Sequence, residues 1–328
     1  MYTVKSSILF LTYKRLEPTQ RVFEIISKVR PKKLYIASDG PKSANIGEAA
    51  RIQEVRTWIL ENINWPCEVH QLFRDHNLGC RKGVGSAIDW FFGHEERGII
   101  LEDDCVPSVS FFQYCDELLE KYEAVEEVMA IGGYNPLGVT TGPEQASYFF
   151  SHYFECWGWA SWRRSWQRYD TNLEDWRSAK VDEYLRNIQN TWAFRSFWRN
   201  ILKDVLDARI DTWAYRMLFS MWRHQGLCII PEKNLVTNVG FGTEASHTTD
   251  SKDNNANASS YELDHPLRDP LVVENDRAIS LRMSVVQFGI STPSVLYRIV
   301  VRTIRKNIPF KHYVRKFIFH KRFRNPLF

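Results

Sequence analysis

Short apolar runs alternate with amphipathic stretches along the first 135 residues of the chain. Five runs have the composition of buried strands: Ser7–Thr12, Lys33–Ser38, Glu68–Phe73, Gly98–Leu101 and Val128–Ile131. Between them, apolar residues recur at helical spacing over Pro18–Val29, Gly47–Asn62, Gly83–Phe92 and Val109–Tyr122. This alternation predicts an α/β fold built on a mainly parallel, doubly wound, Rossmann-like sheet.

Polar and charged residues follow the first four predicted strands, at positions 12–15, 38–40, 73–77 and 102–104. The carboxyl ends of parallel strands meet at one edge of a sheet, and ligands of doubly wound folds bind beyond that edge. We therefore expect the functional site among these four turns.

Tryptophan concentrates in the next part of the chain, where nine of the 12 residues lie between Trp157 and Trp222. We expect Tyr148 to Trp222 to be mostly helical. Large aromatic side chains of this kind either fill a core or form a wall on which sugar rings stack. The wall interpretation is strongest for Trp157 and Trp159, which flank Gly158 in an expected turn and would contact the acceptor.

The last part of the chain is polar and then strongly basic. Thr248–Ser260 has few apolar residues, and we expect a flexible linker over 251–275 followed by a basic, amphipathic helical tail over 276–328. Of the 43 Lys and Arg residues, 12 follow Asp276, which leaves 31 in the body against all 39 acidic residues. A mildly acidic body argues against a nucleic-acid partner. The tail predicts contact with an anionic membrane surface or packing on the body.

Several sequence features bear on the location of the protein. No apolar run approaches the ~20 residues that span a bilayer. The opening residues offer no signal-peptide cleavage site. The six cysteines form no CxxC pair, so we expect them to be reduced. Together these features predict a cytoplasmic protein, peripheral on the inner face of a membrane through its tail.

Three adjacent acids, Glu102-Asp103-Asp104, directly follow a predicted buried strand. Their mutual repulsion is costly at the edge of a core, and a bound divalent cation would relieve it. The competing interpretation is a solvated acidic turn at the start of the next helix.

The segment around this triplet, LEDDCVPSVSFFQYCDELL, resembles the metal-binding DxD region of the GT-A nucleotide-sugar glycosyltransferases. The likeness is closest to the N-acetylglucosaminyltransferase I type, whose triplet is also Glu-Asp-Asp. Other matching pieces follow in the same order: Arg15 after the first strand, Ser38-Asp39-Gly40, Asn77-Leu78-Gly79, Gly158-Trp159, Asp211 before Trp213, and Pro231, Phe241-Gly242 and Ser246-His247. The resemblance covers residues 6–250 and implies one GT-A domain over 1–250. Its nucleotide-sugar half would be 1–135 and its acceptor half 136–250.

The resemblance also implies roles for the residues on the donor side. Asp104 would ligate Mn²⁺ or Mg²⁺ bridging the donor diphosphate. Asp103 would contact the ribose or donor sugar, and Glu102 the nucleotide. Arg15 and Asp39 would hold the uracil end.

Two further roles are implied outside this group. Asp211 would be the general base that deprotonates the acceptor hydroxyl; an N-cap for the helix that begins near Trp213 is the competing interpretation. His247 would lie near the diphosphate as a metal ligand, or it would be an ordinary loop histidine.

These expectations describe an inverting, metal-dependent glycosyltransferase, a hexosyl- or N-acetylhexosaminyltransferase, that uses a UDP-sugar and a glycan or lipid-linked acceptor in polysaccharide biosynthesis. One alternative is a sugar nucleotidyltransferase, although no glycine-rich loop follows the first strand, which ends in Thr12-Tyr13-Lys14-Arg15. The other is a non-catalytic carbohydrate- or partner-binding module on the same fold. The donor sugar, the acceptor and the oligomeric state do not follow from the sequence.

Overall fold

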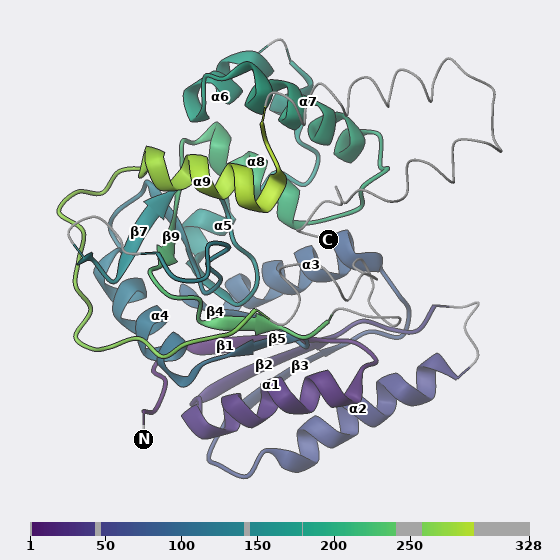
Figure 1. The fold of residues 1–328 in the computed structure, drawn as a ribbon. Coiled ribbons are helices and arrows are strands. Elements are labelled where there is room, and N and C mark those ends of the chain that lie inside the picture. The colour runs from purple at the N-terminus through teal and green to yellow at the C-terminus, as the bar shows by residue number, and fades with distance from the viewer. Residues whose placement is uncertain (1, 43–46, 141–144, 179, 241–257, 292–328) are drawn as a thin grey trace, which may run out of the picture.

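A computed structural model describes residues 2–42, 47–140, 145–178, 180–240 and 258–291. The described chain is a mixed α/β fold around a central sheet (Figure 1). The first part contains, in order, β1 (Ser7–Thr12), α1 (Leu16–Val29), β2 (Lys33–Ser38), α2 (Glu48–Asn62), β3 (Glu68–Phe73), α3 (Gly79–His94), β4 (Arg97–Glu102), β5 (Cys105–Pro107), α4 (Val109–Lys121) and β6 (Val128–Gly132). The sequence-based prediction of alternating strands and helices is confirmed over this part.

The second part departs from the sequence-based prediction at its start. It contains β7 (Tyr148–Ser151), β8 (Trp159–Trp162), α5 (Arg163–Trp166), a 3₁₀ helix η2 (Glu174–Arg177), α6 (Val181–Ile188), α7 (Trp192–Leu206), α8 (Ala214–Arg223), β9 (Leu227–Pro231), β10 (Val236–Asn238) and α9 (Arg277–Phe288). The expectation of a mostly helical segment from Tyr148 is wrong for β7 and β8, because both strands pair with segments distant in sequence.

The sheet among the described residues has eight strands in the order β3-β2-β1-β4-β8-β6-β9-β7. The strands β3, β2, β1 and β4 are parallel, whereas β8 is antiparallel to both β4 and β6. Figure 1 shows α1 and α2 on one face of this parallel part and α3 on the other. The chain builds outward from β1 to β3 and then returns to β4 on the opposite side of β1. The carboxyl ends of β1 and β4 therefore flank a topological switch point, where doubly wound folds bind ligands.

The helix α1 illustrates how the first part packs. Its apolar residues Val22, Phe23, Ile26 and Val29 are buried, and acidic and basic residues occupy the other side. The helix ends at Arg30, which takes the left-handed conformation and donates its N–H to the carbonyl of Ile26. An amphipathic helix held by such a stripe gains most of its stability from burial against the sheet.

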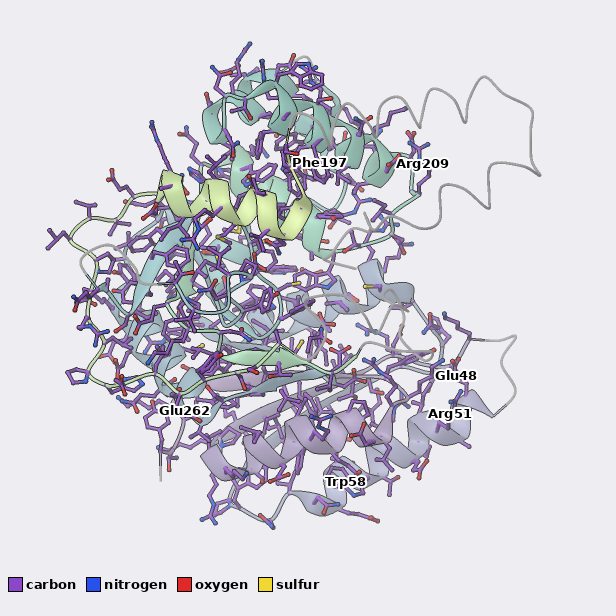
Figure 2. All side chains as sticks on the ribbon, viewed as in Figure 1. Glu48, Arg51, Trp58, Phe197, Arg209 and Glu262 are labelled. Atoms are coloured by element: carbon purple, nitrogen blue, oxygen red, sulfur yellow. The ribbon has the colours of Figure 1, made fainter. Side chains whose placement is uncertain are left out.

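The boundaries expected near the C-terminus need correction. Residues 258–275 are not a free linker, because Tyr261 N–H bonds to Asn234 O and Leu263 N–H bonds to Ser110 Oγ. Glu262, labelled in Figure 2, accepts the backbone N–H groups of Val109 and Ser110 at the start of α4. The composition that suggested a linker belongs to 248–260, most of which lies outside the described residues.

The helix α9 belongs to the body and not to a separate tail. Asp276 caps it by accepting the N–H of Ile279 at 2.9 Å, and Met283 and Phe288 are buried. Phe288 packs on Phe197 of α7, which is labelled in Figure 2. The body of the protein therefore extends at least to residue 291, and the rest of the expected tail, 292–328, lies outside the described residues. All six cysteines are free thiols, as expected.

Candidate functional site

Hydrogen bonds join the turns after the first three strands into one polar edge. The Asn77 side chain, after β3, donates to Gly40 O after β2 and to the Tyr13 hydroxyl after β1, both at 3.1 Å. Tyr13 N–H in turn donates to Asp103 Oδ2, after β4, at 3.3 Å. The carboxyl ends of all four parallel strands thus meet, as the sequence predicts.

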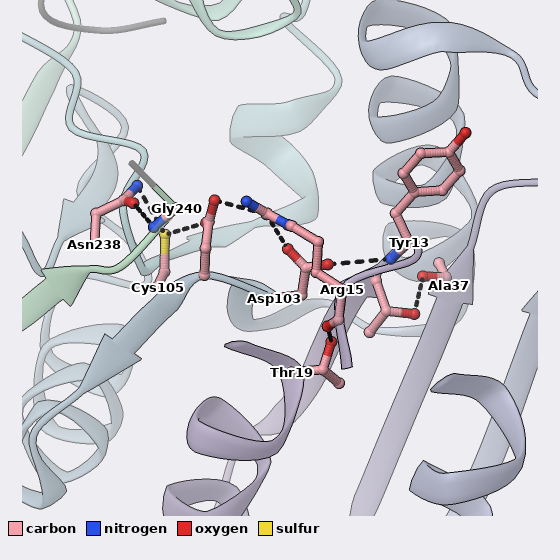
Figure 3. Close-up of polar contacts among 10 residues, drawn as sticks. Tyr13, Arg15, Thr19, Ala37, Asp103, Cys105, Asn238 and Gly240 are labelled. Atoms are coloured by element: carbon pink, nitrogen blue, oxygen red, sulfur yellow. Dashed lines mark hydrogen bonds and ion pairs between the residues drawn. The ribbon is translucent and has the colours of Figure 1, made fainter. Parts of the chain in front are cut away.

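Arg15 lies between the carboxylates of Asp103 and Asp104; Figure 3 labels Arg15 and Asp103. One guanidinium nitrogen, Nη2, donates to Asp103 Oδ1 at 2.5 Å and to Asp104 Oδ2 at 2.7 Å. Asp103 is buried and Asp104 is partly exposed. The sequence suggested a metal ion as the remedy for the repulsion among these acids; in the structure Arg15 already supplies a positive charge. Arg15 is therefore placed with the triplet, and no contact among the described residues turns it toward a separate uracil pocket.

Burial controls the protonation of the triplet. Desolvation raises the pKa of Glu102 to about 8, and the neighbouring charges of Asp104 and Asp103 add to the effect. Desolvation also raises the pKa of Asp103 to about 6, against the opposing influence of Arg15. Glu102 accepts a hydrogen bond from the Trp213 side chain, which fixes it against the second half of the chain.

The segment after β10 covers the triplet closely. The pairing of β10 with β5 brings Asn238 opposite Cys105, and Val239 N–H donates to Asp104 O at 2.8 Å. A Cβ atom on Gly240 would lie only 2.0 Å from Asp104 Oδ2 and 3.0 Å from Arg15 Nη1. A side chain at position 240 would therefore displace the Asp104 carboxylate that Arg15 holds, so this close approach favours glycine. Sequence reasoning missed this glycine, because nothing local to it signals the contact.

Asp39 fixes the start of α3. Its carboxylate accepts the N–H of Leu78 through both oxygens, at 3.1 and 3.0 Å, and Oδ1 also accepts the N–H of Gly40 at 3.1 Å. The Arg56 guanidinium donates to the carbonyls of Ser38, Asp39 and Arg74, which holds the same turn from below. The structure therefore gives Asp39 a capping role for α3 at the polar edge.

Asp211 reaches the same edge from the second half of the chain. Its Oδ1 accepts from Arg81 Nε at 2.7 Å, and a Cβ on Gly79 would lie 3.7 Å from its Oδ2. The helix α8 begins at Ala214, whose N–H is satisfied by Thr212 Oγ1 at 3.2 Å. Asp211 is thus not the N-cap of α8, and its side chain is 53% exposed beside the start of α3. Arg81 is a second residue that sequence reasoning did not single out.

The expected acceptor wall is largely interior. Trp159 is fully buried in β8, and its ring stacks on Trp213 with centroids 5.5 Å apart. The acceptor role predicted for Trp159 is therefore wrong, because no face of the ring is available to a sugar. Trp157 is 8% exposed and packs against Tyr134 at 4.4 Å, so the core interpretation holds for it as well. The left-handed turn expected at Gly158 is present, with φ of +61°.

Of the two predicted metal ligands, Asp104 belongs to the polar edge, and His247 lies outside the described residues. Within the described ranges no group of three or more His, Cys, Asp and Glu side chains could hold a metal ion. Asp104 keeps one oxygen, Oδ1, whose only described partner is the weak thiol donor of Cys105 at 3.5 Å. A carboxylate oxygen of this kind suits a hard cation whose other ligands come from a substrate phosphate.

No protein-family model matches the sequence, and a search of curated proteins finds no match. Solved structures with some likeness include HddC from Yersinia pseudotuberculosis, with 9% identity and a TM-score of 0.30 over 48% of this chain and 77% of that one. TarS 1-349 from S. aureus has 10% identity and a TM-score of 0.38 over 71% of this chain and 59% of that one. Both likenesses are too loose to say what this chain does.

Proposed function

We propose that the protein is an inverting, metal-dependent glycosyltransferase that transfers a sugar from a UDP-sugar to a hydroxyl of a glycan or lipid-linked acceptor. The observation that supports this most is that Asp103 and Asp104 lie beside Arg15 at the topological switch point, while Asp211 pairs with Arg81 at the start of α3 on the same edge of the sheet. The resemblance of the triplet region to GT-A glycosyltransferases agrees with this assignment.

On the donor side, the edge offers charges of both signs. Arg15 and Arg81 are the cations that a diphosphate would meet, and each already pairs with a carboxylate. We propose that Asp39 and Arg15 border the nucleotide, and that Asp103 and Glu102 hydrogen-bond to its sugars. Glu102 in its protonated form can donate as well as accept.

Asp104 is the residue we propose for Mn²⁺ or Mg²⁺, with His247 as a further ligand. The ion would neutralise charge on the leaving nucleoside diphosphate. Arg15 already lies between Asp103 and Asp104, so the ion would add to a positive charge that the chain itself supplies.

Asp211 is the residue we propose as general base. Arg81 holds one carboxylate oxygen and orients the group, which leaves Oδ2 to accept the proton of an acceptor hydroxyl. The acceptor oxygen that loses this proton attacks the anomeric carbon of the donor sugar, and the bond from that carbon to the diphosphate breaks with its electron pair on the diphosphate. Attack from the opposite face inverts the anomeric centre. Proton transfer to a positioned base is typically worth 10²–10⁴-fold in rate.

The test is a screen of UDP- and GDP-sugars for release of the free nucleoside diphosphate, with Mn²⁺ and with excess EDTA. We expect UDP from at least one UDP-sugar, lost in EDTA and greatly reduced in Asp211→Asn. Release of pyrophosphate from a nucleoside triphosphate and a sugar phosphate would instead identify a nucleotidyltransferase. Sugar-nucleotide binding without any turnover would identify a binding module.

A further inference from the structure

The helix α9 alternates buried and exposed residues in pairs along its length. The buried side consists of Ile279, Ser280, Met283, Ser284, Gln287 and Phe288. The exposed side consists of Arg277, Ala278, Leu281, Arg282, Val285 and Val286. A surface helix normally turns its apolar side inward; here half of the inward residues are polar and the outward side carries Leu and Val.

The inward side is fixed by specific partners. Ser280 Oγ lies 2.9 Å from Ser151 Oγ of β7, and Gln287 Nε2 donates to Glu155 Oε2 at 3.1 Å. Phe288 stacks on Tyr153 with ring centroids 5.3 Å apart. These contacts fix which side of α9 faces outward (Figure 1). The packing of the inward side therefore determines that Leu281, Val285 and Val286 face outward.

Exposed apolar residues also lie in the segment that leads into the helix. The described chain has nine exposed large hydrophobic residues, and six of them lie within residues 271–286: Leu271, Val272, Val273, Leu281, Val285 and Val286. We call these six residues the apolar ridge. Scattered single hydrophobic residues on a surface are ordinary, but a cluster marks an interaction site.

The charge around the ridge is of one sign along the helix. The outward side of α9 carries Arg277 and Arg282 and no acid, while Asp276 is engaged as the cap and Glu274 precedes it. From Arg277 to the last residue the sequence holds 12 Lys and Arg and no Asp or Glu. Helices that lie in a membrane interface insert apolar side chains and keep Lys and Arg near them, at the level of the anionic headgroups.

We propose that the apolar ridge is a docking surface for an anionic lipid bilayer. The six ridge residues would enter the interface, while Arg277 and Arg282 on the outward side of α9 would meet the lipid headgroups. This goes beyond transfer of a sugar, because it fixes which side of the folded body faces the membrane. No helix among the described residues is long and apolar enough to cross a bilayer.

A second copy of the chain fits this surface less well. In a two-fold dimer the same patch meets itself, which would bring Arg277 and Arg282 of two chains together without described acids on the helix to pair with them. A bilayer that carries anionic lipid offers both the apolar and the negative component.

The test is sedimentation of the full-length protein with vesicles of phosphatidylcholine alone or with 30% phosphatidylglycerol, without any nucleotide. The variant Val285→Gln/Val286→Gln removes two ridge residues and leaves all cations in place. Val139→Gln is the matched control, because Val139 is 54% exposed and lies outside the ridge. Thermal melts check that all three proteins are folded.

We expect the wild type and the control to bind the anionic vesicles and the double variant to bind at least tenfold more weakly. At about 1 M salt, where the screening length falls to about 3 Å, residual binding of the wild type should persist and that of the double variant should vanish. Equal binding of variant and wild type would overturn the proposal. A wild-type dimer that the double variant converts to monomers would also overturn it, in favour of a second copy.

Discussion

Charged side chains gather where strands end in residues 2–135, whereas in residues 145–240 aromatic rings fill the interior. The first region brings Arg15, Asp39, Asp103 and Asp104 to one edge. In the second region eight of the nine tryptophans are buried, and only Trp192 is largely exposed. The second region touches the polar edge through Asp211 and Trp213, which contact Arg81 and Glu102.

This contrast shows how the two regions divide their roles. Parallel strands place several loops at a common edge, so polar residues there cost little and can carry chemistry. The aromatic region is a rigid support, since each large ring buries 150–250 Å². Changes in the first region should therefore affect reaction rates, and changes in the second should affect stability.

The largest effect is expected at the polar edge. Asp104→Ala should abolish transfer, by at least about 10³-fold, and weaken UDP binding in Mn²⁺, because it removes the proposed metal ligand while Arg15 keeps its pair with Asp103. Initial rates, UDP titration and a thermal melt measure the three properties. Glu54→Ala, at an exposed position of α2 away from the polar edge, is the control and should stay active. Full activity of Asp104→Ala would show that the edge is not the reaction centre.

Trp159→Ala tests the aromatic region. It removes the stacking on Trp213 and the edge contact with Phe154, and should lower the free energy of unfolding by roughly 3–5 kcal/mol. Trp192→Ala, at an exposed position, should change it by no more than about 0.5 kcal/mol. Urea unfolding measures both. A stable Trp159→Ala protein with weakened acceptor binding would restore the sugar-wall interpretation.

Asp211→Asn tests the point where the second region enters the chemistry. Turnover should fall by roughly 10²-fold or more with donor affinity nearly unchanged, because the amide cannot accept the proton. Asp207→Asn is the matched control, because Asp207 lies in the same region, 145–240, and is paired with Lys203 and Arg209. If Asp211→Asn changes stability alone, the residue serves only its ion pair with Arg81.

Gly240→Ala should have a smaller effect at the edge. The added methyl group must displace Asp104 Oδ2, and we expect transfer to fall about tenfold. Gly93→Ala within α3 is the control, because a methyl group added there would meet no atom within 4 Å and the helix should gain roughly 0.5–1 kcal/mol. Activity assays on both variants measure the difference. Equal activity in the two proteins would mean that the segment after β10 can move away from Asp104 without loss of function.

The smallest effect concerns Glu155, a buried acid of the aromatic region. Burial raises its pKa well above the usual value of 4.5. The folded state therefore holds a proton that the unfolded state releases, so this contribution to stability is complete below pH 4.5 and is lost as pH rises toward the folded pKa. Glu155→Gln keeps a neutral group beside Gln287, and at pH 8 it should be more stable than the wild type by about 1 kcal/mol.

Urea midpoints of the two proteins at pH 5 and pH 8 check this prediction. The raised pKa values of Glu102 and Asp103 also lower stability as the pH rises, but equally in both proteins. The change in urea midpoint between pH 5 and pH 8 therefore differs between the two proteins only through Glu155. An equal change in urea midpoint in the two proteins would mean that Glu155 is ionised in the folded protein.

The sequence was informative where structure is local. The strands Ser7–Thr12, Lys33–Ser38 and Glu68–Phe73 are each followed by the helix that covers them, so periodicity and turn residues suffice to place them. The grouping of Arg15, Asp39 and the triplet followed from the same rule, since parallel strands end at a common edge.

What the sequence could not predict depends on contacts between distant segments. The strand Trp159–Trp162 pairs with β4 and β6, and its composition alone is compatible with helix. The ion pairs of Arg15 with Asp103 and Asp104 were not predicted, since spacing does not show which acid an arginine meets. The requirement at Gly240 arises from the approach of a segment more than a hundred residues away, and α9 could not be separated from the tail by composition.

The position of β8 also affects how the chain folds as it is synthesised. Trp159 pairs with Ile100 of β4 on one side and with Gly132 of β6 on the other, so this strand joins the two regions into one sheet. The strands β1 to β4 can pair soon after they leave the ribosome, but the outer edge of β4 stays unpaired until residues 159–162 have been made. Open strand edges are templates for aggregation, and such long-range pairing is slow. The two regions are therefore expected to depend on each other for folding, and each should aggregate or remain unfolded when it is produced alone.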